Sequence, residues 1–160
     1  MSRLQAMIYR VTAQRDLLDH IADHLTLPEG PVLELGLGNG RTFSHLQTRF
    51  ADRRLIAFDR TLGAHQGSHP DGDDLILGEI SVTAEQFVGK NAALVHADIG
   101  KGYADKDAIT LKWLPQLVAG LLAPGGIAVS GLPLVHADLQ PLLMPASVDN
   151  AYYFLYRRAV

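Results

Sequence analysis

The sequence predicts an α/β fold, with a three-layer, doubly wound and mostly parallel sheet. Short apolar runs that suit buried strands alternate with segments of helical periodicity, which is the pattern of a parallel sheet covered by helices. Acidic residues follow several of these runs, at the edge where such a sheet binds its ligands. At 160 residues and 48% hydrophobic composition, the chain suffices for one core, so we assign residues 1–160 to a single domain.

The first predicted element is an amphipathic helix over residues 2–25. Ser2 and Gln5 match a capping box at its start. Its apolar residues recur at spacings of three, four and seven, at Leu4, Ile8, Val11, Leu18, Ile21 and Leu25. This stripe suits core packing or a contact with a second subunit.

A glycine-rich turn follows the first predicted strand. The strand, residues 31–35, runs into Gly36, Gly38 and Gly40, and a helix is expected over residues 42–50. Glycine adopts positive φ without steric penalty and lets a ligand approach the backbone. A helix N-terminus adds free N–H groups and a partial positive charge. Together these features predict a cradle for a nucleotide-like ligand.

The spacing of the turn narrows the ligand. A phosphate-binding P-loop ends in Gly-Lys-Ser/Thr, whereas Arg41 and Thr42 follow Gly40 here. The dinucleotide fingerprint needs its third glycine at the position of Arg41. What remains is Glu-x-Gly-x-Gly-x-Gly from Glu34 to Gly40. A carboxylate at the strand end suits a ligand that carries an ammonium and a sulfonium, and it repels a pyrophosphate.

Acids end or follow the next predicted strands. The strand over residues 53–59 ends at Asp59, about 20 residues past the glycine turn, where a doubly wound fold places the acid that holds ribose hydroxyls. The strand over residues 74–80 carries Gly78, Glu79 and Ile80 at its end.

The predicted strand over residues 93–98 ends at Asp98, where the ligand crevice of an open sheet lies. Three roles are open to Asp98: orienting a substrate, acting as a general base, or capping the turn. His96 alternates with Ala97 and is interpreted as a core histidine on the opposite side of the sheet.

The crossover over residues 60–74 is rich in glycine and has no helical apolar stripe, although a parallel crossover of this length usually contains a helix. His65 and His69 lie near Asp71 and Asp73, but the intervening glycines and proline do not favour one helical face. We therefore predict a mobile polar loop and no metal site; a lid near the active site is the alternative.

The second half of the chain contains two predicted helices and a further strand. Thr83 and Gln86 suggest a capping box that opens a short helix. A longer helix is expected over residues 107–122, and Pro115 should kink it or start a second piece. The strand over residues 127–130 follows a Pro-Gly-Gly turn.

The C-terminal pattern is weaker. Three prolines in residues 132–145 leave room for a short helix at about residues 137–143. Residues 152–157 alternate aromatic and apolar side chains and predict a last strand.

Four landmarks, in order, resemble the class I S-adenosylmethionine-dependent methyltransferases. They are Glu34 to Gly40, Asp59, Gly78-Glu79-Ile80 and Pro124-Gly125-Gly126, and the resemblance covers roughly residues 31–130. It implies a Rossmann-like methyltransferase fold with S-adenosyl-L-methionine as cofactor. Members usually close with a helix and two strands, so the short tail here predicts an abbreviated C-terminal edge. In the family, a helix before the first strand commonly packs on the sheet or over the cofactor pocket.

The resemblance also implies which residues bind the cofactor. The glycine turn wraps its methionine part, the acid ending the second strand holds its ribose, and the residues after the third strand meet its adenine. The residues expected on this basis are Glu34, Gly36, Leu37, Gly38, Asn39, Gly40, Thr42, Asp59, Arg60, Gly78, Glu79, Ile80 and Asp98. Asp98 is the expected catalytic residue, and His136 is the alternative.

Two subclasses of that family fit less well. Enzymes that act on exocyclic amines or amides carry Asp/Asn-Pro-Pro and an aromatic residue, where this chain has Asp98-Ile99-Gly100-Lys101. The magnesium-dependent catechol type has an Asp-Asn pair where Ser130-Gly131 stands, so we expect no metal. Little surface remains to grip a polymer, which favours a small-molecule acceptor.

Composition bounds the partners and the location. A net charge of −3 gives no general attraction to nucleic acid or to an anionic membrane, and we expect neither partner. No apolar run approaches the roughly 20 residues that span a bilayer, and charged residues interrupt the N-terminus. We expect a cytoplasmic protein, and a homo-oligomer whose second subunit covers the open sheet edge.

The leading hypothesis is therefore an S-adenosylmethionine-dependent methyltransferase. A second is a regulatory protein that binds the cofactor but has lost catalysis. A third is a nicotinamide-dependent oxidoreductase on the same layout, against which Arg41 argues.

Overall fold

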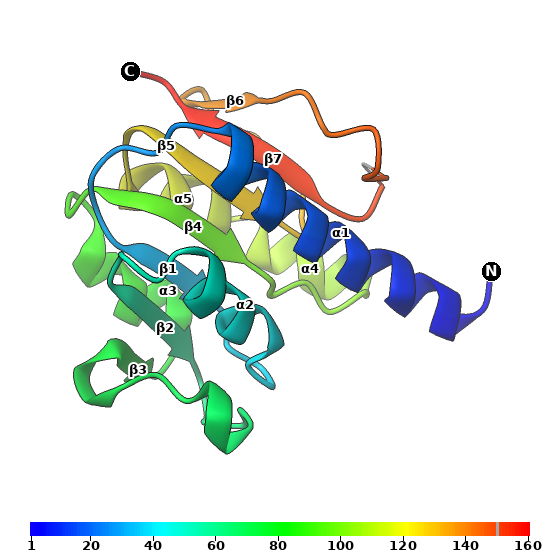
Figure 1. Cartoon of the computed structure of the whole chain (residues 1–160), viewed down its shortest axis with the longest axis horizontal. Helices are drawn as coiled ribbons and strands as arrows, with labels where there is room; N and C mark the ends of the chain where they lie inside the picture. Colours follow the sequence, from blue (N-terminus) through cyan, green and yellow to red (C-terminus); the bar gives the residue numbers. More distant parts are fainter. Residues whose placement is uncertain (150) are drawn as a thin grey trace.

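The computed structural model describes residues 1–149 and 151–160 (Figure 1). The strands of this part form one seven-stranded sheet in the order β3-β2-β1-β4-β5-β7-β6. β1 to β5 pair with one another in parallel, whereas β7 is antiparallel to both β5 and β6. The predicted doubly wound, mostly parallel sheet is confirmed. Its strands are β1 (Val32–Leu35), β2 (Leu55–Asp59), β3 (Leu75–Leu77), β4 (Ala92–Ala97), β5 (Leu122–Ser130), β6 (Leu139–Pro141) and β7 (Phe154–Arg158).

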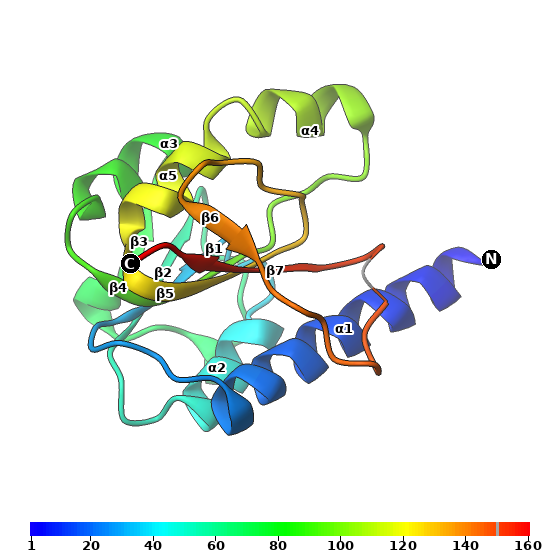
Figure 2. The ribbon, with the colours of Figure 1, turned by 90° about the horizontal axis from the view of Figure 1, so that it is seen from above.

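Helices cover both faces of the sheet, as the view from above shows (Figure 2). One face carries α1 (Arg3–His24) and α2 (Arg41–Arg49). The other carries α3 (Ile80–Thr83), α4 (Ala104–Thr110) and α5 (Leu114–Leu121). None of the helices in the described residues is long and apolar enough to cross a membrane.

Strand side chains alternate between two cores, because successive residues of a strand point to opposite faces. Val32 and Leu94 pack with α1, and Leu33 and Val95 pack with α5. Glu34 pairs with His96 in the parallel register of β1 and β4, two residues after Val32 and Leu94. These two polar residues therefore lie side by side on the α1 face.

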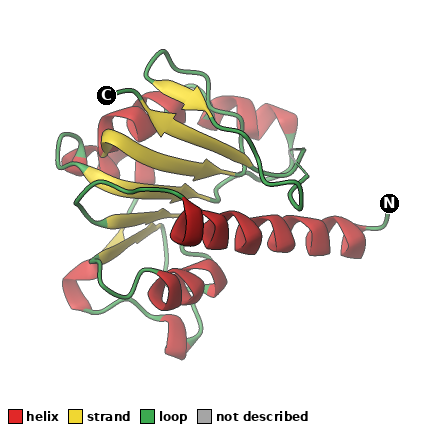
Figure 3. Ribbon diagram, turned by 45° about the horizontal axis from the view of Figure 1, so that its top comes forward, coloured by secondary structure: helices red, strands yellow, loops and turns green. Residues whose placement is uncertain are grey.

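The N-terminal helix packs on the sheet with only part of its length. Its predicted capping box is confirmed: Ser2 and Gln5 each bond the other's backbone N–H through their side chains. The buried positions begin at Ala13, whereas Leu4 is 67% exposed and Ile8 is 52% exposed. The first turns of α1 extend beyond the sheet (Figure 3).

The crossover between β2 and β3 contains no α-helix, as predicted; it has only two short 3₁₀ helices, η1 (Gln66–Ser68) and η2 (Gly72–Asp74). The capping box predicted at Thr83 is wrong. The helix begins three residues earlier, at Ile80, and the Thr83 hydroxyl donates to the Glu79 carbonyl instead. The chain continues as a third 3₁₀ helix, η3 (Ala84–Phe87).

Pro115 starts a second helical piece, as one of the two predictions for it stated. It lies in the first turn of α5, where a missing backbone N–H leaves no hydrogen bond unmade. β5 begins at Leu122, earlier than predicted, and its register with β4 shifts before Ile127. Gly125 has a φ of +80° in this irregular stretch.

The short helix predicted at about residues 137–143 is wrong, because Leu139–Pro141 form the edge strand β6. Pro141 lacks the N–H that a helix needs, and edge strands tolerate proline. Pairing with β7 extends past both ends of β6: Ala159 N–H donates to the Asp138 carbonyl, and Leu142 N–H to the Leu155 carbonyl. Within the described residues, the sheet edge thus has both closing strands and no helix.

Candidate active site

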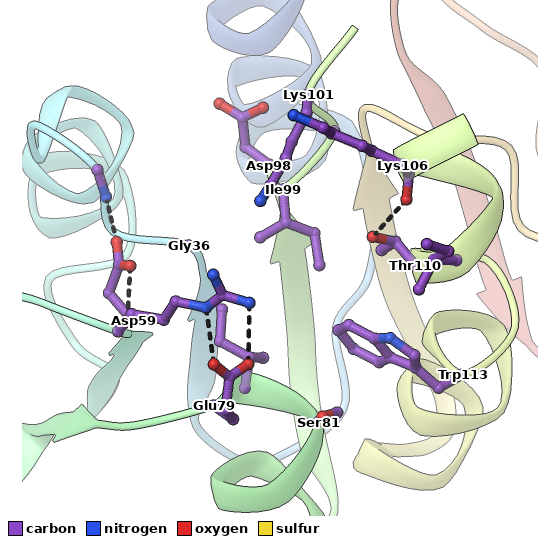
Figure 4. Close-up of a pocket in the computed structure, with 15 residues that line it drawn as sticks. Gly36, Asp59, Glu79, Ser81, Asp98, Ile99, Lys101, Lys106, Thr110 and Trp113 are labelled. Carbon is purple, nitrogen blue, oxygen red and sulfur yellow. Dashed lines mark hydrogen bonds and ion pairs between the residues drawn. The ribbon is translucent and has the colours of Figure 1, made fainter. Parts of the chain in front are cut away.

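A cavity of about 670 Å³ opens where β1, β2, β3 and β4 end (Figure 4). Its volume lies within the range that small-molecule and cofactor sites occupy. Seven of the residues predicted to bind a cofactor line it: Gly36, Gly38, Asp59, Arg60, Glu79, Ile80 and Asp98.

Two glycines give the turn after β1 its shape. Gly36 has a φ of +91°, and a Cβ there would lie 2.6 Å from the Ile99 methyl and 2.9 Å from the Asp98 carbonyl oxygen. Gly38 has a φ of +54°, and a Cβ there would meet no atom within 4 Å. Gly36 therefore packs the turn against the end of β4, whereas Gly38 borders open space in the cavity.

Asp59 connects the turns after β1 and β2. One of its carboxylate oxygens accepts from the Gly38 N–H at 2.8 Å, and the other from the Arg60 N–H at 2.7 Å. The carboxylate is thus oriented by backbone donors and keeps lone pairs for a ligand, because each oxygen accepts more than one hydrogen bond.

Arg60 and Glu79 both line the cavity and form a two-point ion pair, with N–O distances of 3.0 Å. Their side chains are 62% and 59% exposed. Such an exposed pair contributes little to stability, so a ligand can replace it at small cost.

Glu34 does not line the cavity. It is 1% exposed, its Oε2 accepts from the Thr42 hydroxyl at 2.9 Å, and its Oε1 lies 2.5 Å from Nδ1 of His96. The carboxylate thus forms hydrogen bonds with the first turn of α2 and with a core histidine, and it lies beneath the glycine turn. His96 lies on the α1 face and is fully buried, as expected for a core histidine.

Five other predicted residues, Leu37, Asn39, Gly40, Thr42 and Gly78, also lie outside the cavity lining. Leu37 is buried in a small core cluster. The Asn39 carbonyl accepts from the His65 N–H, and the Gly78 N–H donates to the Asp59 carbonyl. A Cβ on Gly40 would meet Ser68 at 2.7 Å. The crossover after β2 therefore packs on the outer side of the glycine turn.

The histidines of that crossover make local contacts. The Gly67 N–H donates to Nδ1 of His65, and the His69 ring nitrogen bonds the Ala64 carbonyl at 2.9 Å. Within residues 1–149 and 151–160, no three His, Asp or Glu side chains are placed to share a metal ion.

Asp98 lies between two cavities. It lines the large one and also a second cavity of about 330 Å³, which shares Gly100 and Lys101 with the first. Helix α1 supplies both of its side-chain partners: Arg10 forms an ion pair with Oδ1, and Gln14 donates to Oδ2 at 2.9 Å.

Sequence reasoning missed the wall of the large cavity opposite Asp59. This wall comes from α4 and the residues after it. Its side chains recur three and four positions apart in the sequence, which is the spacing of one helix face. Its side chains are Lys106, Ile109, Thr110 and Trp113 (Figure 4). Ser81 and the residues that directly follow Asp98 complete the lining.

His136, the alternative catalytic residue, lies outside both cavities. Its Nε2 is 2.8 Å from the Gln116 amide oxygen, and its Nδ1 accepts from the Asp138 N–H. These contacts fix the loop before β6.

These features define a class of protein. A doubly wound sheet, a glycine turn after β1, an acid ending β2 and a large cavity at the same edge form a site for a nucleoside-containing cofactor.

Comparison with known proteins identifies the family. A model of an S-adenosyl-L-methionine methyltransferase family matches residues 1–158. The crystal structure of an S-adenosyl-L-methionine methyl transferase from Silicibacter pomeroyi DSS-3 is 37% identical, covers 99% of both chains and superposes with a TM-score of 0.89. The chain belongs to this S-adenosyl-L-methionine methyltransferase family. None of the curated proteins matched it.

More distant structures share the fold alone. A putative methylase from Haemophilus influenzae is 11% identical, with a TM-score of 0.63 over 95% of this chain and 99% of that one. The antibiotic-resistance methyltransferase Kmr is 12% identical, with a TM-score of 0.56 over 91% and 93%. The plantazolicin methyltransferase BamL, solved with S-adenosylhomocysteine, is 17% identical, with a TM-score of 0.53 over 80% of this chain and 47% of that one.

The protein is accordingly an S-adenosylmethionine-dependent methyltransferase. The residues present fit such a cofactor: Gly38 borders open space, and the Asp59 carboxylate is held by two backbone N–H groups and keeps lone pairs free.

Proposed function

We propose that this methyltransferase acts on a small molecule held beside Asp98. The observation that carries the proposal is the pair of cavities, of about 670 and 330 Å³, that meet at Asp98. The larger cavity suits the cofactor. The smaller cavity, which is lined by Arg10, Lys101 and Tyr152 among others, leaves room for a compact acceptor.

Each part of the large cavity has a proposed role. The backbone at Gly36 and Gly38 holds the methionine part of the cofactor, and Asp59 holds the ribose hydroxyls. Ile80 covers the adenine, and Glu79 accepts from its amino group after leaving Arg60. For Glu34 we propose an indirect role, because its carboxylate is buried and bonds Thr42 and His96.

The chemistry needs alignment more than activation. The bound cofactor supplies a sulfonium whose methyl group is already activated for transfer. The chain's contribution is to hold the acceptor atom in line, which proximity makes effective. In this proposal Asp98 accepts a hydrogen bond from the acceptor's O–H or N–H and takes its proton. Arg10 and Gln14 hold that carboxylate from the α1 side.

The cofactor assignment predicts that Asp59→Ala weakens S-adenosylmethionine binding by about 10- to 100-fold. Hydrogen bonds to a charged group contribute roughly 1.5–3 kcal/mol, and the same change frees the Gly38 N–H. Calorimetric titration with the cofactor and with S-adenosylhomocysteine measures the loss. Asp71→Ala, an exposed acid on the crossover, is the matched control. Equal affinities for the Asp59 and Asp71 variants would contradict the assignment.

The two turn glycines should respond differently to alanine. Gly38→Ala should lower stability by only about 1–2 kcal/mol, the cost of a left-handed backbone, yet weaken cofactor binding at least roughly tenfold because its methyl enters the cavity. Gly36→Ala should destabilise the fold itself, because its methyl overlaps backbone and Ile99. Thermal melting and calorimetry on both variants check this. Loss of folding in the Gly38 variant with normal folding in the Gly36 variant would refute it.

Two further expectations stay predictions. A homo-oligomer is supported by the apolar side chains that the free part of α1 exposes, among them Leu4 and Ile8. A cytoplasmic location also stays a prediction.

A further inference from the structure

Buried polar side chains form one connected chain on the α1 face. Among the described residues, the buried polar or charged ones are Gln14, Glu34, His96 and Ser130. The first three are joined through Tyr153, which is itself fully buried. The proposed cofactor and acceptor roles leave this chain unexplained.

The chain runs from below the glycine turn to Asp98. His96 Nδ1 lies 2.5 Å from a Glu34 oxygen, and His96 Nε2 lies 3.2 Å from the Tyr153 hydroxyl. Gln14 Nε2 lies 2.6 Å from that hydroxyl and 2.9 Å from Oδ2 of Asp98. Gln14 lies on α1, Glu34 on β1 and His96 on β4, whereas Tyr153 directly precedes β7.

The donors and acceptors fit together in only one direction. The Glu34 carboxylate can only accept, so His96 Nδ1 must carry a proton and donate it. Burial raises the pKa of the Tyr153 hydroxyl far above its usual range, so the hydroxyl keeps its proton. That proton goes to Nε2 of His96, which accepts when Nδ1 carries the ring proton, so Gln14 faces the hydroxyl oxygen with a donating N–H. The second N–H of the same amide then points at Asp98.

This order fixes the Gln14 amide. Were the amide turned over, its oxygen would face the Asp98 carboxylate, and two acceptors would meet without a proton between them. The Tyr153 hydroxyl would also lose a donor in a buried place, where an unmade hydrogen bond is costly. The Asp98 carboxylate and the Tyr153–His96 bond thus require the same orientation of the Gln14 amide.

We propose that Gln14 is a positioning residue for Asp98, and that Tyr153, His96 and Glu34 set the orientation of its amide. This positioning matters for methyl transfer only if Asp98 handles the acceptor, so in that respect it rests on the proposed function. The geometry itself concerns the free protein and can be tested there. In this arrangement α1 fixes the carboxylate at both oxygens, through Arg10 and Gln14, before any acceptor arrives.

The test is NMR spectroscopy of the free protein. The Asp98 carboxyl carbon and the two His96 ring nitrogens are followed in the wild type and in Tyr153→Phe, which removes a hydroxyl that does not touch Asp98. We expect a proton on Nδ1 of His96 in the wild type. In Tyr153→Phe, we expect a changed tautomer balance and a shifted Asp98 carboxyl resonance. Gln14→Met, which keeps volume but has no N–H, should shift the same Asp98 resonance.

The matched control is Tyr156→Phe. Tyr156 lies on β7, three residues after Tyr153, and is also buried. It packs in the opposite core, and its hydroxyl accepts from the Leu134 N–H. This variant should lose stability without moving the Asp98 or His96 resonances. A proton on Nε2 of wild-type His96 would overturn the proposal. So would an Asp98 resonance that stays unchanged in Tyr153→Phe and Gln14→Met.

A binding measurement separates this proposal from the proposed function. S-adenosylhomocysteine should bind the wild type and Tyr153→Phe with affinities within about threefold of each other, because Tyr153 does not line the cofactor cavity. Failure of S-adenosylhomocysteine to bind the wild type would remove the assigned cofactor site but leave the NMR outcome standing. Normal binding with unmoved resonances would remove the positioning role alone.

Discussion

Replacing Asp98 by Asn is expected to lower the rate of methyl transfer by about 10²- to 10⁴-fold, the usual contribution of a positioned proton acceptor. The amide keeps the shape of the side chain but cannot take a proton, and its NH₂ group would face donors from α1. The rate is measured with methyl-labelled S-adenosylmethionine and a panel of small amines, phenols, carboxylic acids and thiols, using the member that the wild type methylates.

The affinity for the cofactor distinguishes this effect from loss of the site. Asp98→Asn should change the dissociation constant of S-adenosylmethionine by less than about tenfold, because Asp98 contacts the cavity at one end only. Asp105→Asn on the exposed side of α4 is the control and should transfer the methyl group at the wild-type rate. A full rate in Asp98→Asn would exclude Asp98 as the group that handles the acceptor's proton.

Glu34→Ala is expected to lower the free energy of unfolding by about 3–5 kcal/mol, since it removes one side of a buried charged hydrogen-bond pair. The His96 N–H and the Thr42 hydroxyl would both lose their acceptor, and His96 is completely buried. For a chain of this size the change corresponds to a fall in melting temperature of roughly 10 °C or more. Chemical denaturation and calorimetric melting measure it.

Glu34→Gln tests whether the charge or the shape matters. Its amide oxygen still accepts from one neighbour, so its loss of stability should be clearly smaller than that of the alanine variant. A Glu34→Ala protein as stable as the wild type would show that the pair with His96 does not hold the core together.

The central strands were predictable from the sequence because they are short, apolar and followed by glycine or acid. β1, β2 and β4 appear close to their predicted positions, and the Ser2 capping box and the break at Pro115 are also as predicted. In each case the signal is local: a side chain acts on backbone a few residues away. The edge strand β6 was missed because its pairing partner β7 is distant in sequence and its proline-rich stretch resembles a loop.

The candidate site divides in the same way. Residues at strand ends, such as Asp59 and Asp98, could be placed because a parallel sheet gathers its carboxyl ends at one edge. The α4 wall required knowing how that helix folds back over the sheet. Arg10 and Gln14 gave no local signal, because their contacts with Asp98 join residues 88 and 84 positions apart.

The contact between Gln14 and Tyr153 has a consequence for the order of folding. It joins residues 139 positions apart, from the first helix to the residue directly before the last strand of the sheet. Contacts so distant in sequence form late, because closing a long loop costs entropy before the contact forms. The β1–β4 region can collapse early, but Asp98 obtains its oriented amide only after β7 joins the sheet. We expect the glycine turn to reach its native structure before the surroundings of Asp98 do. A folding intermediate that lacks β7 would then have the cofactor cavity without a fixed Asp98.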